Sequence, residues 1–504
     1  MATDSASTPE AYDALLDRYR RKIYVDDANG VLNWDQEVMM PEGGTPARSK
    51  QRGALSAIAH DLLVDDDVDA WLGELDSVPL SGDESAVVRE IRRQYERQAA
   101  VPTELVEEIS RATSEAHPVW REAREADDFD AFAPTLERLL NLRREYAEHI
   151  DASADPYEVL FADFEPYLDL ETAERILETL RDRLVPLIDA IGDSDVELHS
   201  ISGTFPADAQ MDVAREALSR LDYDFDRGRI DLAPHPFSTG TQFDARVTTR
   251  FDESDPLDSL TSTIHEFGHA NYTLGLRDDA YGTPLGQNRG LIVHESQSRL
   301  WENHVARTLP FWEGFLPTFN DQHGTSVTPR EAYEAANRVY EDNLIRVEAD
   351  ELTYHLHIVL RFEIERELLS RELDIEEVPA VWNDRMEDYL GVRPDTDTDG
   401  CLQDIHWSHG SFGYFPTYSL GSVLAAQLYA AAADEIDDLD SNVREGTVAP
   451  LREWLTENVH RHGCRFPTEE LIEVATGEPF TADHFLEYAE SKYATLYDLD
   501  RDEF

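Results

Sequence analysis

Apolar residues recur every three to four positions along most of this chain, the spacing of one buried face of a helix. The pattern fills the first 150 residues and recurs clearly at 171–191, 333–347 and 351–369. The longest nearly apolar stretch, residues 418–436, contains Ser, Gly and Gln, and therefore predicts a buried helix and no membrane span. The periodicity predicts a mainly α protein.

One interval breaks the helical pattern. Residues 229–251, RIDLAPHPFSTGTQFDARVTTRF, contain Pro, Gly and an alternation of apolar and polar positions, which is typical of two or three short strands. The interval comes directly before the sequence HEFGH, so we expect a small sheet beside that motif. With no internal repeat and no Ser/Gly linker, residues 1–504 are predicted to form a single domain in two halves that flank a cleft.

The net charge of the chain limits the partners it can bind and the conditions in which it can stay folded. The 105 acidic residues outnumber the 44 basic ones, the formal net charge is −61, and three residues are lysine. The hydrophobic fraction of 41% still allows a large core, so the charge indicates a folded protein that needs ionic screening, as in the salt-loaded cytoplasm of a halophile. Nucleic acid is excluded as a partner because phosphate binding requires basic patches.

Cysteine usage and the N-terminus indicate a cellular compartment. Cys401 and Cys464 form no disulfide framework and fit a reducing environment. The N-terminal sequence MATDSASTPEAYDALLDRY is acidic and polar, unlike a secretory signal. We therefore expect a cytoplasmic protein with no membrane partner.

The segment HEFGH carries the chemistry. Asp255 and Pro256 predict a helix start, and a buried stripe follows at helical spacing: Leu257, Leu260, Ile264, Phe267 and Leu274. His265 and His269 fall together on another face, one turn apart, where two imidazoles can bind one metal ion. Glu266 can reach a water at that ion, and Gly275 is expected to end the helix.

A third ligand must come from elsewhere. The extended motif with a third histidine would place it at position 275, which is Gly275, so that arrangement is excluded. Glu295, on a helix predicted from Gly290 to Pro310, lies 26 residues beyond His269 and suits a glutamate-ligand zinc peptidase. Arg299, four residues on, could orient its carboxylate. The alternative is that Glu295 is a solvated surface residue.

Six motifs in order resemble the carboxypeptidase Taq family of metallocarboxypeptidases. They are HPF at 235–237, DARVT at 244–248, HEFGH at 265–269, HESQ at 294–297, IRVEAD at 345–350 and GCLQDIHW at 400–407. The resemblance implies a helical fold with a long narrow cleft, similar to thimet oligopeptidase and angiotensin-converting enzyme. It also implies a homodimer that removes single C-terminal amino acids from peptides with broad specificity.

The resemblance further assigns the metal and its ligands. It implies one zinc ion per subunit, with cobalt also used in the family. The ligands would be His265, His269 and Glu295, and Glu266 would be the general base.

Residues 409–418, HGSFGYFPTY, are similar to the His/Tyr segment of thimet-type oligopeptidases. The oxyanion formed during peptide hydrolysis needs hydrogen-bond donors. We expect Tyr418 and His409 to supply them, with Tyr414 as the alternate. The competing interpretation is that the two tyrosines are core aromatics at helical spacing.

A carboxypeptidase must also bind a free carboxylate. Arg346 is the predicted group, since a guanidinium holds a carboxylate with two parallel hydrogen bonds. Arg346 lies in an apolar stretch that is predicted to be helical, and it needs an anionic partner, either the substrate or Asp350 at the fourth position after it. In the second case the pair is a structural salt bridge.

The sequence allows more than one role for other residues of the motifs. His235 could contact substrate or be hydrogen-bonded in the core, and Arg246 could contact substrate or form a salt bridge with Asp244, two residues away on a strand. Asp404 and His406 are also two apart, and their pairing could orient the site.

Two other functions compete with a metallocarboxypeptidase. One is an endo-acting oligopeptidase of the thimet type on the same fold, which would need no group for a free carboxylate. The other is a catalytically silent peptide-binding protein, which the intact Glu266 and three intact ligands disfavour.

Overall fold

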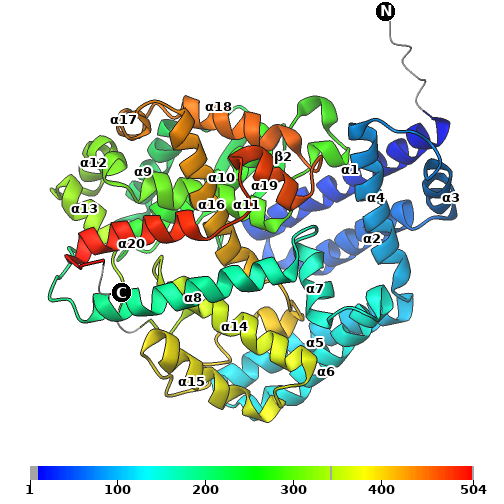
Figure 1. Ribbon diagram of the computed structural model, residues 1–504, viewed down its shortest axis with the longest axis horizontal. Helices are drawn as coiled ribbons and strands as arrows, with labels where there is room; N and C mark the ends of the chain where they lie inside the picture. Colours follow the sequence, from blue (N-terminus) through cyan, green and yellow to red (C-terminus); the bar gives the residue numbers. More distant parts are fainter. Residues whose placement is uncertain (1–8, 341–342, 502–503) are drawn as a thin grey trace, which may run out of the picture. The chain divides into compact units, whose positions relative to one another are not determined.

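Helices dominate the computed structural model of the chain, which describes residues 9–340, 343–501 and 504 (Figure 1). The mainly α prediction is confirmed. The chain forms two compact units, each assembled from separate segments. The first contains residues 1–100, 205–289 and 447–467, and the second contains residues 101–204, 290–446 and 468–504. That residues 1–504 act as one peptidase domain with a cleft stays a prediction, and the first eight residues of the acidic N-terminus lie outside the described part.

The first unit is built around long amphipathic helices. They are α1 (Glu10–Val38), α2 (Thr45–Leu63), α3 (Asp66–Leu75), α4 (Gly82–Ala100), α9 (Ala207–Arg220), α10 (Pro256–Gly275) and α18 (Ala449–Asn458). Helix α1 buries Leu15, Tyr19 and Ile23, four residues apart, in a core that also includes Leu72 of α3 and Ile91 of α4. The helical period of the sequence thus becomes one buried face.

The unit also holds a three-stranded sheet, which confirms the strands predicted at 229–251. Strand β1 (Gly228–Leu232) pairs in parallel with β3 (Asp244–Thr249), and β2 (Ser238–Thr241) pairs with β3 in antiparallel, giving the order β1-β3-β2. The central strand β3 packs against α10, so the sheet supports the helix that carries HEFGH.

In the described part of the second unit, the regular secondary structure is all helical. Its helices are α5 (Thr103–Ala126), α6 (Phe129–Asp151), α7 (Pro156–Phe164), α8 (Leu170–Gly192), α11 (Leu291–Arg299), α12 (Leu309–His323), α13 (Pro329–Ala336), α14 (Thr353–Ser370), α15 (Val378–Leu390), α16 (Pro416–Glu435), α17 (Leu439–Glu445), α19 (Thr468–Thr476) and α20 (Asp483–Tyr497). The predicted helices at 171–191, 351–369 and 418–436 are confirmed as α8, α14 and α16.

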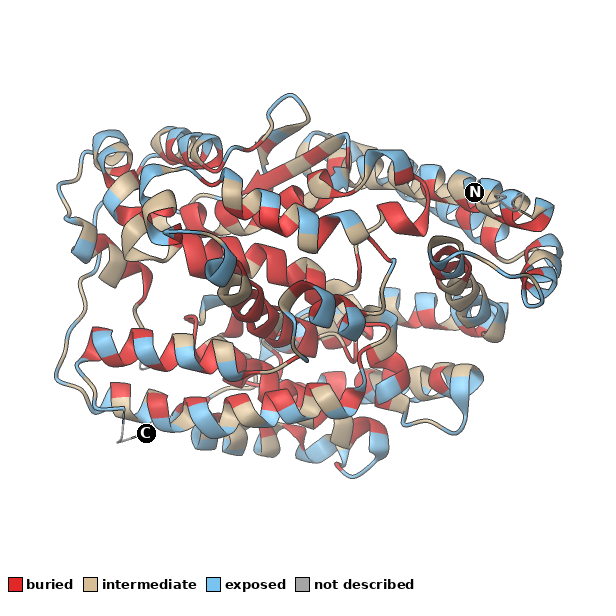
Figure 2. Ribbon diagram, turned by 45° about the horizontal axis from the view of Figure 1, so that its top comes forward, coloured by how far each residue is buried: buried red, intermediate tan, exposed pale blue. Residues whose placement is uncertain are grey.

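Burial distinguishes these helices (Figure 2). Helix α8 alternates buried and exposed positions, as expected for an outer helix, whereas α16 is buried around most of its circumference. Short 3-10 turns complete both units, at Glu42–Gly44, Asp278–Ala280, Pro284–Gly286, Arg346–Glu348, Ile375–Glu377, His406–His409 and His460–His462. Among the described residues, no helix is both long and apolar enough to span a bilayer.

Two predicted helices are wrong in extent. The helix expected at 333–347 ends with α13 at Ala336, because the side-chain amide of Asn337 donates to the carbonyl oxygens of Tyr333 and Arg307. The described residues beyond it are irregular as far as the short turn at Arg346, and residues 341–342 lie outside the description.

The helix predicted from Gly290 to Pro310 also differs. It starts as expected, but after Arg299 it continues as a π-helix, Leu300–Ala306. Pro310 does not terminate it. Thr308 caps the next helix, α12, and Pro310 occupies its first turn, where a missing N–H is tolerated.

Candidate active site

Helix α10 presents the two histidines of the motif as predicted. The carboxylate of Asp255 accepts hydrogen bonds from the N–H groups of Leu257 (2.9 Å) and Asp258 (3.2 Å), which fixes the start of the helix. The rings of His265 and His269 lie 4.9 Å apart, one turn apart on the same face. Glu266 is 7% exposed, so its carboxylate sits in a largely dry environment.

The end of α10 explains why the third ligand is not a histidine in the same segment. A side chain at Gly275 would overlap the imidazole of His460, which is completely buried. Any side chain at position 275 would therefore require His460 to move.

Helix α11 carries Glu295, which is 8% exposed, so the interpretation as a solvated surface residue is wrong. Arg299 donates from Nε to Oε1 of Glu295 over 2.8 Å, as its spacing of four residues predicted. The hydroxyl of Ser298 donates to Oε2 over 3.1 Å. Both carboxylate oxygens are thus held in one orientation.

The start of α11 is fixed by a residue that sequence reasoning missed. Glu165, completely buried after α7, accepts a hydrogen bond from the N–H of Ile292 (2.9 Å) and another from the hydroxyl of Thr468 (2.6 Å). A carboxylate at a helix N-terminus satisfies free N–H groups and complements the helix dipole. The partners are more than one hundred residues apart in sequence, so no local pattern could reveal them.

The metal-ligating atoms of His265, His269 and Glu295 all lie within 4.8 Å of one another. Two imidazoles and one carboxylate form the donor set of many catalytic zinc sites, in which three protein ligands leave one position open. The residues present therefore fit a divalent metal ion, and they form a candidate metal site.

A cluster of tyrosines lies at the start of α16. The ring of Tyr418 lies 5.2 Å from that of Tyr414 and 6.0 Å from that of Tyr354. Burial and the neighbouring phenols of Tyr354 and Tyr414 raise the pKa of Tyr418 well above its ordinary value, so its hydroxyl stays a donor at neutral pH. Tyr354 was not predicted, although it follows the IRVEAD motif by only four residues.

The two histidines of the preceding turn have different neighbours. The exposed His409 faces His117 of α5, with ring centroids 5.7 Å apart. His406 stacks on Tyr414 at 5.6 Å, and its Nδ1 lies 3.4 Å from Oδ1 of Asp404, so the two residues expected to pair are neighbours.

Arg346 pairs with a protein carboxylate other than Asp350. Its guanidinium donates to Asp404, with the shortest bond at 2.7 Å from Nη2, and to the hydroxyl of Tyr354 at 3.2 Å. Asp404 also accepts from Arg361 at 2.6 Å. Burial alone would raise the pKa of Asp404, but Arg361, His406 and Arg346 together hold that pKa well below its ordinary value.

The alternative in which Arg346 pairs with Asp350 is wrong, because the turn at Arg346–Glu348 does not continue as a helix. The carboxylate of Asp350 instead accepts from the N–H groups of Leu352 (2.9 Å) and Thr353 (3.0 Å) at the start of α14.

Two further predicted residues belong to the sheet region. Arg246 forms the expected salt bridge with Asp244 (2.5 Å) and stacks over the ring of Trp34 at 4.2 Å. His235 is exposed in the irregular segment between β1 and β2.

A buried carboxyl group braces the loop that carries the His/Tyr segment. Glu365 of α14 is completely buried and accepts hydrogen bonds from Nε1 of Trp407 and from the N–H of Gly413, both over 3.0 Å. Gly413 has φ +83° and no room for a Cβ against the backbone of Phe161. Burial raises the pKa of Glu365 to about 8.

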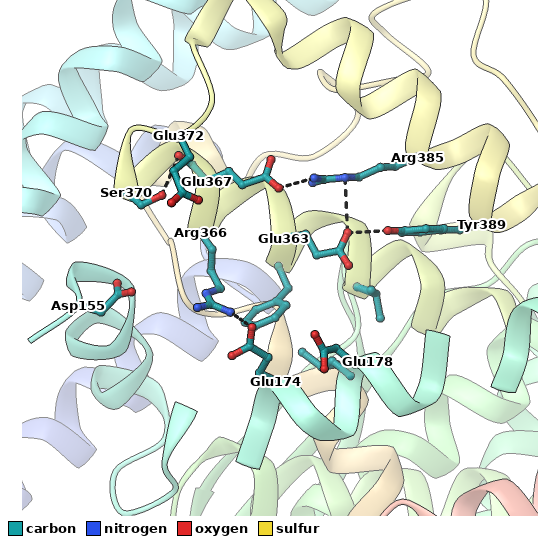
Figure 3. A pocket seen from close by; sticks show the side chains of 13 residues that line it. Asp155, Glu174, Glu178, Glu363, Arg366, Glu367, Ser370, Glu372, Arg385 and Tyr389 are labelled. Carbon is teal, nitrogen blue, oxygen red and sulfur yellow. Dashed lines mark hydrogen bonds and ion pairs between the residues drawn. The ribbon is translucent and has the colours of Figure 1, made fainter. Parts of the chain in front are cut away.

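A cavity of about 480 Å³ opens among α8, α14 and α15 (Figure 3). Its charged groups are largely paired with one another: Arg385 binds Glu363 and Glu367, Arg366 binds Glu174, and Tyr389 donates to Glu363. The predicted site residues are not among those that line it, so we interpret it as a structural feature of this helix packing.

Comparison with known proteins agrees with this site. The model of the carboxypeptidase Taq (M32) metallopeptidase family matches residues 14–493. Thermostable carboxypeptidase 1 of Thermus thermophilus is 39% identical over 97% of this chain and 100% of its own, and its namesake from Pyrococcus furiosus is 36% identical over 96% and 98%. The crystal structure of an M32 carboxypeptidase from Deinococcus radiodurans superposes with a TM-score of 0.94 at 36% identity, covering 97% of this chain and 100% of that one.

The chain belongs to the carboxypeptidase Taq (M32) family of metallopeptidases. Its function is that of a metallocarboxypeptidase, which uses a divalent metal ion and acts on peptides. The comparisons support this activity and give no support to an endo-acting oligopeptidase. The resemblance inferred from the six motifs is confirmed.

Proposed function

We propose that the protein is a zinc carboxypeptidase in which His265, His269 and Glu295 bind the metal and Glu266 is the general base. The observation that carries this proposal is the convergence of the three ligating groups within 4.8 Å, next to a buried glutamate. A zinc ion bound there would act as a Lewis acid toward water and the scissile carbonyl, and cobalt could replace it. The expected stoichiometry is one ion per subunit.

Proton transfer falls to Glu266. Its carboxylate takes a proton from the attacking water and delivers it to the leaving amine, so that one group serves as base and then as acid. The position of Glu266 directly after His265 on helix α10 supports this role.

Tyr418 is proposed to donate a hydrogen bond to the oxyanion. Its raised pKa keeps the hydroxyl protonated, and its ring lies beside Tyr414, the alternate donor. His409 was predicted as a second donor and remains so in this proposal, although its ring faces His117.

Arg346 is proposed to recognise the terminal carboxylate of the peptide. Two guanidinium groups, from Arg346 and Arg361, share the single carboxylate of Asp404, which leaves one excess positive charge. Arg361 is completely buried, and Arg346 lies over the ring of Tyr418 at 5.5 Å. Arg346 is thus the member of the group placed toward the tyrosine cluster, where a substrate carboxylate would offset the charge. Secondary contacts with substrate are proposed for His235 and Arg246.

The setting of the enzyme is also a proposal. The net charge of −61 supports work in a salt-rich cytoplasm, and membership of the family supports a homodimer.

The decisive experiment offers N-blocked dipeptides with free and with amidated C-termini to the purified protein in molar KCl. It is run with metal-free enzyme and after addition of zinc or cobalt. Release of the C-terminal amino acid from the free acid alone, dependent on metal, is expected. Equal cleavage of both substrates would contradict an exopeptidase.

A further inference from the structure

The most informative unassigned feature is a close approach between α11 and α16 at the carboxylate of Glu295. The two helices pack against each other within the second unit. At the point of contact α16 has a glycine, Gly421, three residues after Tyr418. We propose that Gly421 is a positioning residue: it seats Glu295 in its metal-binding place and sets its distance from Tyr418. This inference rests on the proposed role of Glu295 as a metal ligand.

The geometry leaves no space for a side chain at position 421. A Cβ built on Gly421 would lie 2.5 Å from both Cβ and Cγ of Glu295, far inside van der Waals contact. The obstacle is not backbone strain, since Gly421 lies inside a regular helix. Glycine within a helix costs about 1 kcal/mol relative to alanine, so its presence here needs a reason, and the close contact supplies one.

The neighbours of Glu295 prevent it from moving away from a side chain at position 421. Its carboxylate is held by Arg299 and Ser298, and Glu295 itself is 8% exposed. The atoms that a Cβ would strike are the root of this side chain, which cannot rotate away as a flexible end could. An added methyl group must therefore shift α16 or displace the carboxylate.

Either response changes the site in a predictable way. Displacement of the carboxylate weakens metal binding, and residues that orient a ligand typically contribute about 10–100-fold to metal affinity. A shift of α16 moves Tyr418 as well, because one turn of helix connects it to Gly421.

The test is the variant Gly421→Ala, with Gly53→Ala as the matched control. Gly53 lies within α2, and a Cβ there would meet nothing within 4 Å. We expect G421A to bind zinc at least 10-fold more weakly in competition with a chelator, while G53A binds as the wild type does. Unchanged zinc affinity in a folded G421A protein would overturn the proposal.

If G421A folds poorly, a double-mutant cycle of thermal stability on the metal-free protein still tests the proposal. Glu295→Gly removes the atoms that would collide, so the double variant G421A/E295G should regain much of the thermal stability that G421A loses. Additive losses in the two single variants and their combination would show that the damage arises elsewhere in α16, and would also overturn the proposal.

The variant Glu295→Gln separates this proposal from the one on which it rests. If E295Q binds zinc as the wild type does, Glu295 is not a ligand and the proposed metal site fails. If E295Q loses zinc and G421A retains it, only the role of Gly421 fails.

Discussion

Arg299 and Glu295 are joined by a hydrogen bond of 2.8 Å between Nε and Oε1, within one turn of α11. The same guanidinium also bonds Glu302 of the π-helix at 3.2 Å and lies 5.0 Å over the ring of Tyr354. Arg299 thus connects the carboxylate of the candidate metal site to the tyrosine cluster. This single side chain links the group proposed to bind metal to the groups proposed to stabilise charge during the reaction.

Replacing Arg299 by alanine should weaken zinc binding by about 10–100-fold, because Glu295 loses the donor that orients it. Chelator competition on the purified protein measures the effect. The matched control is Arg330→Ala, which removes the same kind of pair with Glu334 on α13, where Arg330 is exposed. An equal effect of both variants on zinc binding would mean that Arg299 has no specific role.

Replacing Glu266 by glutamine should reduce kcat by about 10²–10⁴-fold while zinc stays bound, since the ligands remain and the proton carrier is lost. Metal analysis and steady-state kinetics on one preparation provide the measurement. A kcat close to the wild-type value would contradict the assignment of Glu266 as the base.

The parts of the candidate site that depend on local sequence could be predicted. The parts that depend on contacts between residues far apart in the sequence could not. His265, Glu266 and His269 are one helical turn of sequence, and the cap at Asp255 fixes that helix, so the sequence alone suffices to place them. The strands at 229–251 could likewise be predicted from the alternation of apolar and polar positions.

Arg346 shows where such reasoning stops. Helical spacing suggested Asp350 as its partner, but the chain leaves the helix at Ala336, and the actual partner, Asp404, is 58 residues away. Glu165, Glu365 and Gly421 were missed for the same reason, because each acts on a segment that only the tertiary fold brings near.

Glu365 predicts a pH dependence of stability. Burial raises its pKa from 4.5 to about 8, so the folded state holds this proton more tightly than the unfolded state. The stabilising contribution is therefore fully present below about pH 4.5 and is lost as pH rises toward 8. Glu365→Gln has no carboxyl group at this position to titrate. The thermal midpoint of the wild type minus that of E365Q should therefore fall as pH rises from about 4.5 to about 8. The exposed Glu372→Gln serves as control for the loss of one carboxylate, and a flat difference between wild type and E365Q would contradict the argument.

Salt should stabilise the protein. At a net charge of −61 the folded state repels itself, and the screening length falls from about 10 Å at 0.1 M salt to about 3 Å at 1 M. The thermal midpoint should therefore rise steadily from low to multimolar KCl. The same midpoint at both extremes would exclude a halophilic adaptation.

The role of Arg346 can be separated from a structural one. Removing its guanidinium leaves Asp404 paired with Arg361, so neither of these two buried charges loses its partner and the thermal midpoint should change little. Substrate binding should change much more. For Arg346→Ala we expect a higher KM for peptides with a free C-terminus. Their kcat/KM should fall by a factor that corresponds to about 2–5 kcal/mol of lost transition-state stabilisation.

The amidated peptide gives the discriminating measurement, because it lacks the charge that Arg346 is proposed to bind. R346A should narrow the preference for the free acid over the amide, whereas the control Arg385→Ala, another largely buried and paired arginine, should leave that preference intact. Arg346→Lys should recover only part of the preference, since an ammonium cannot reproduce the planar, two-bond geometry of a guanidinium. If R346A instead unfolds at a lower temperature and keeps its discrimination, Arg346 is structural. Arg246, already bound by Asp244, is then the next residue to replace.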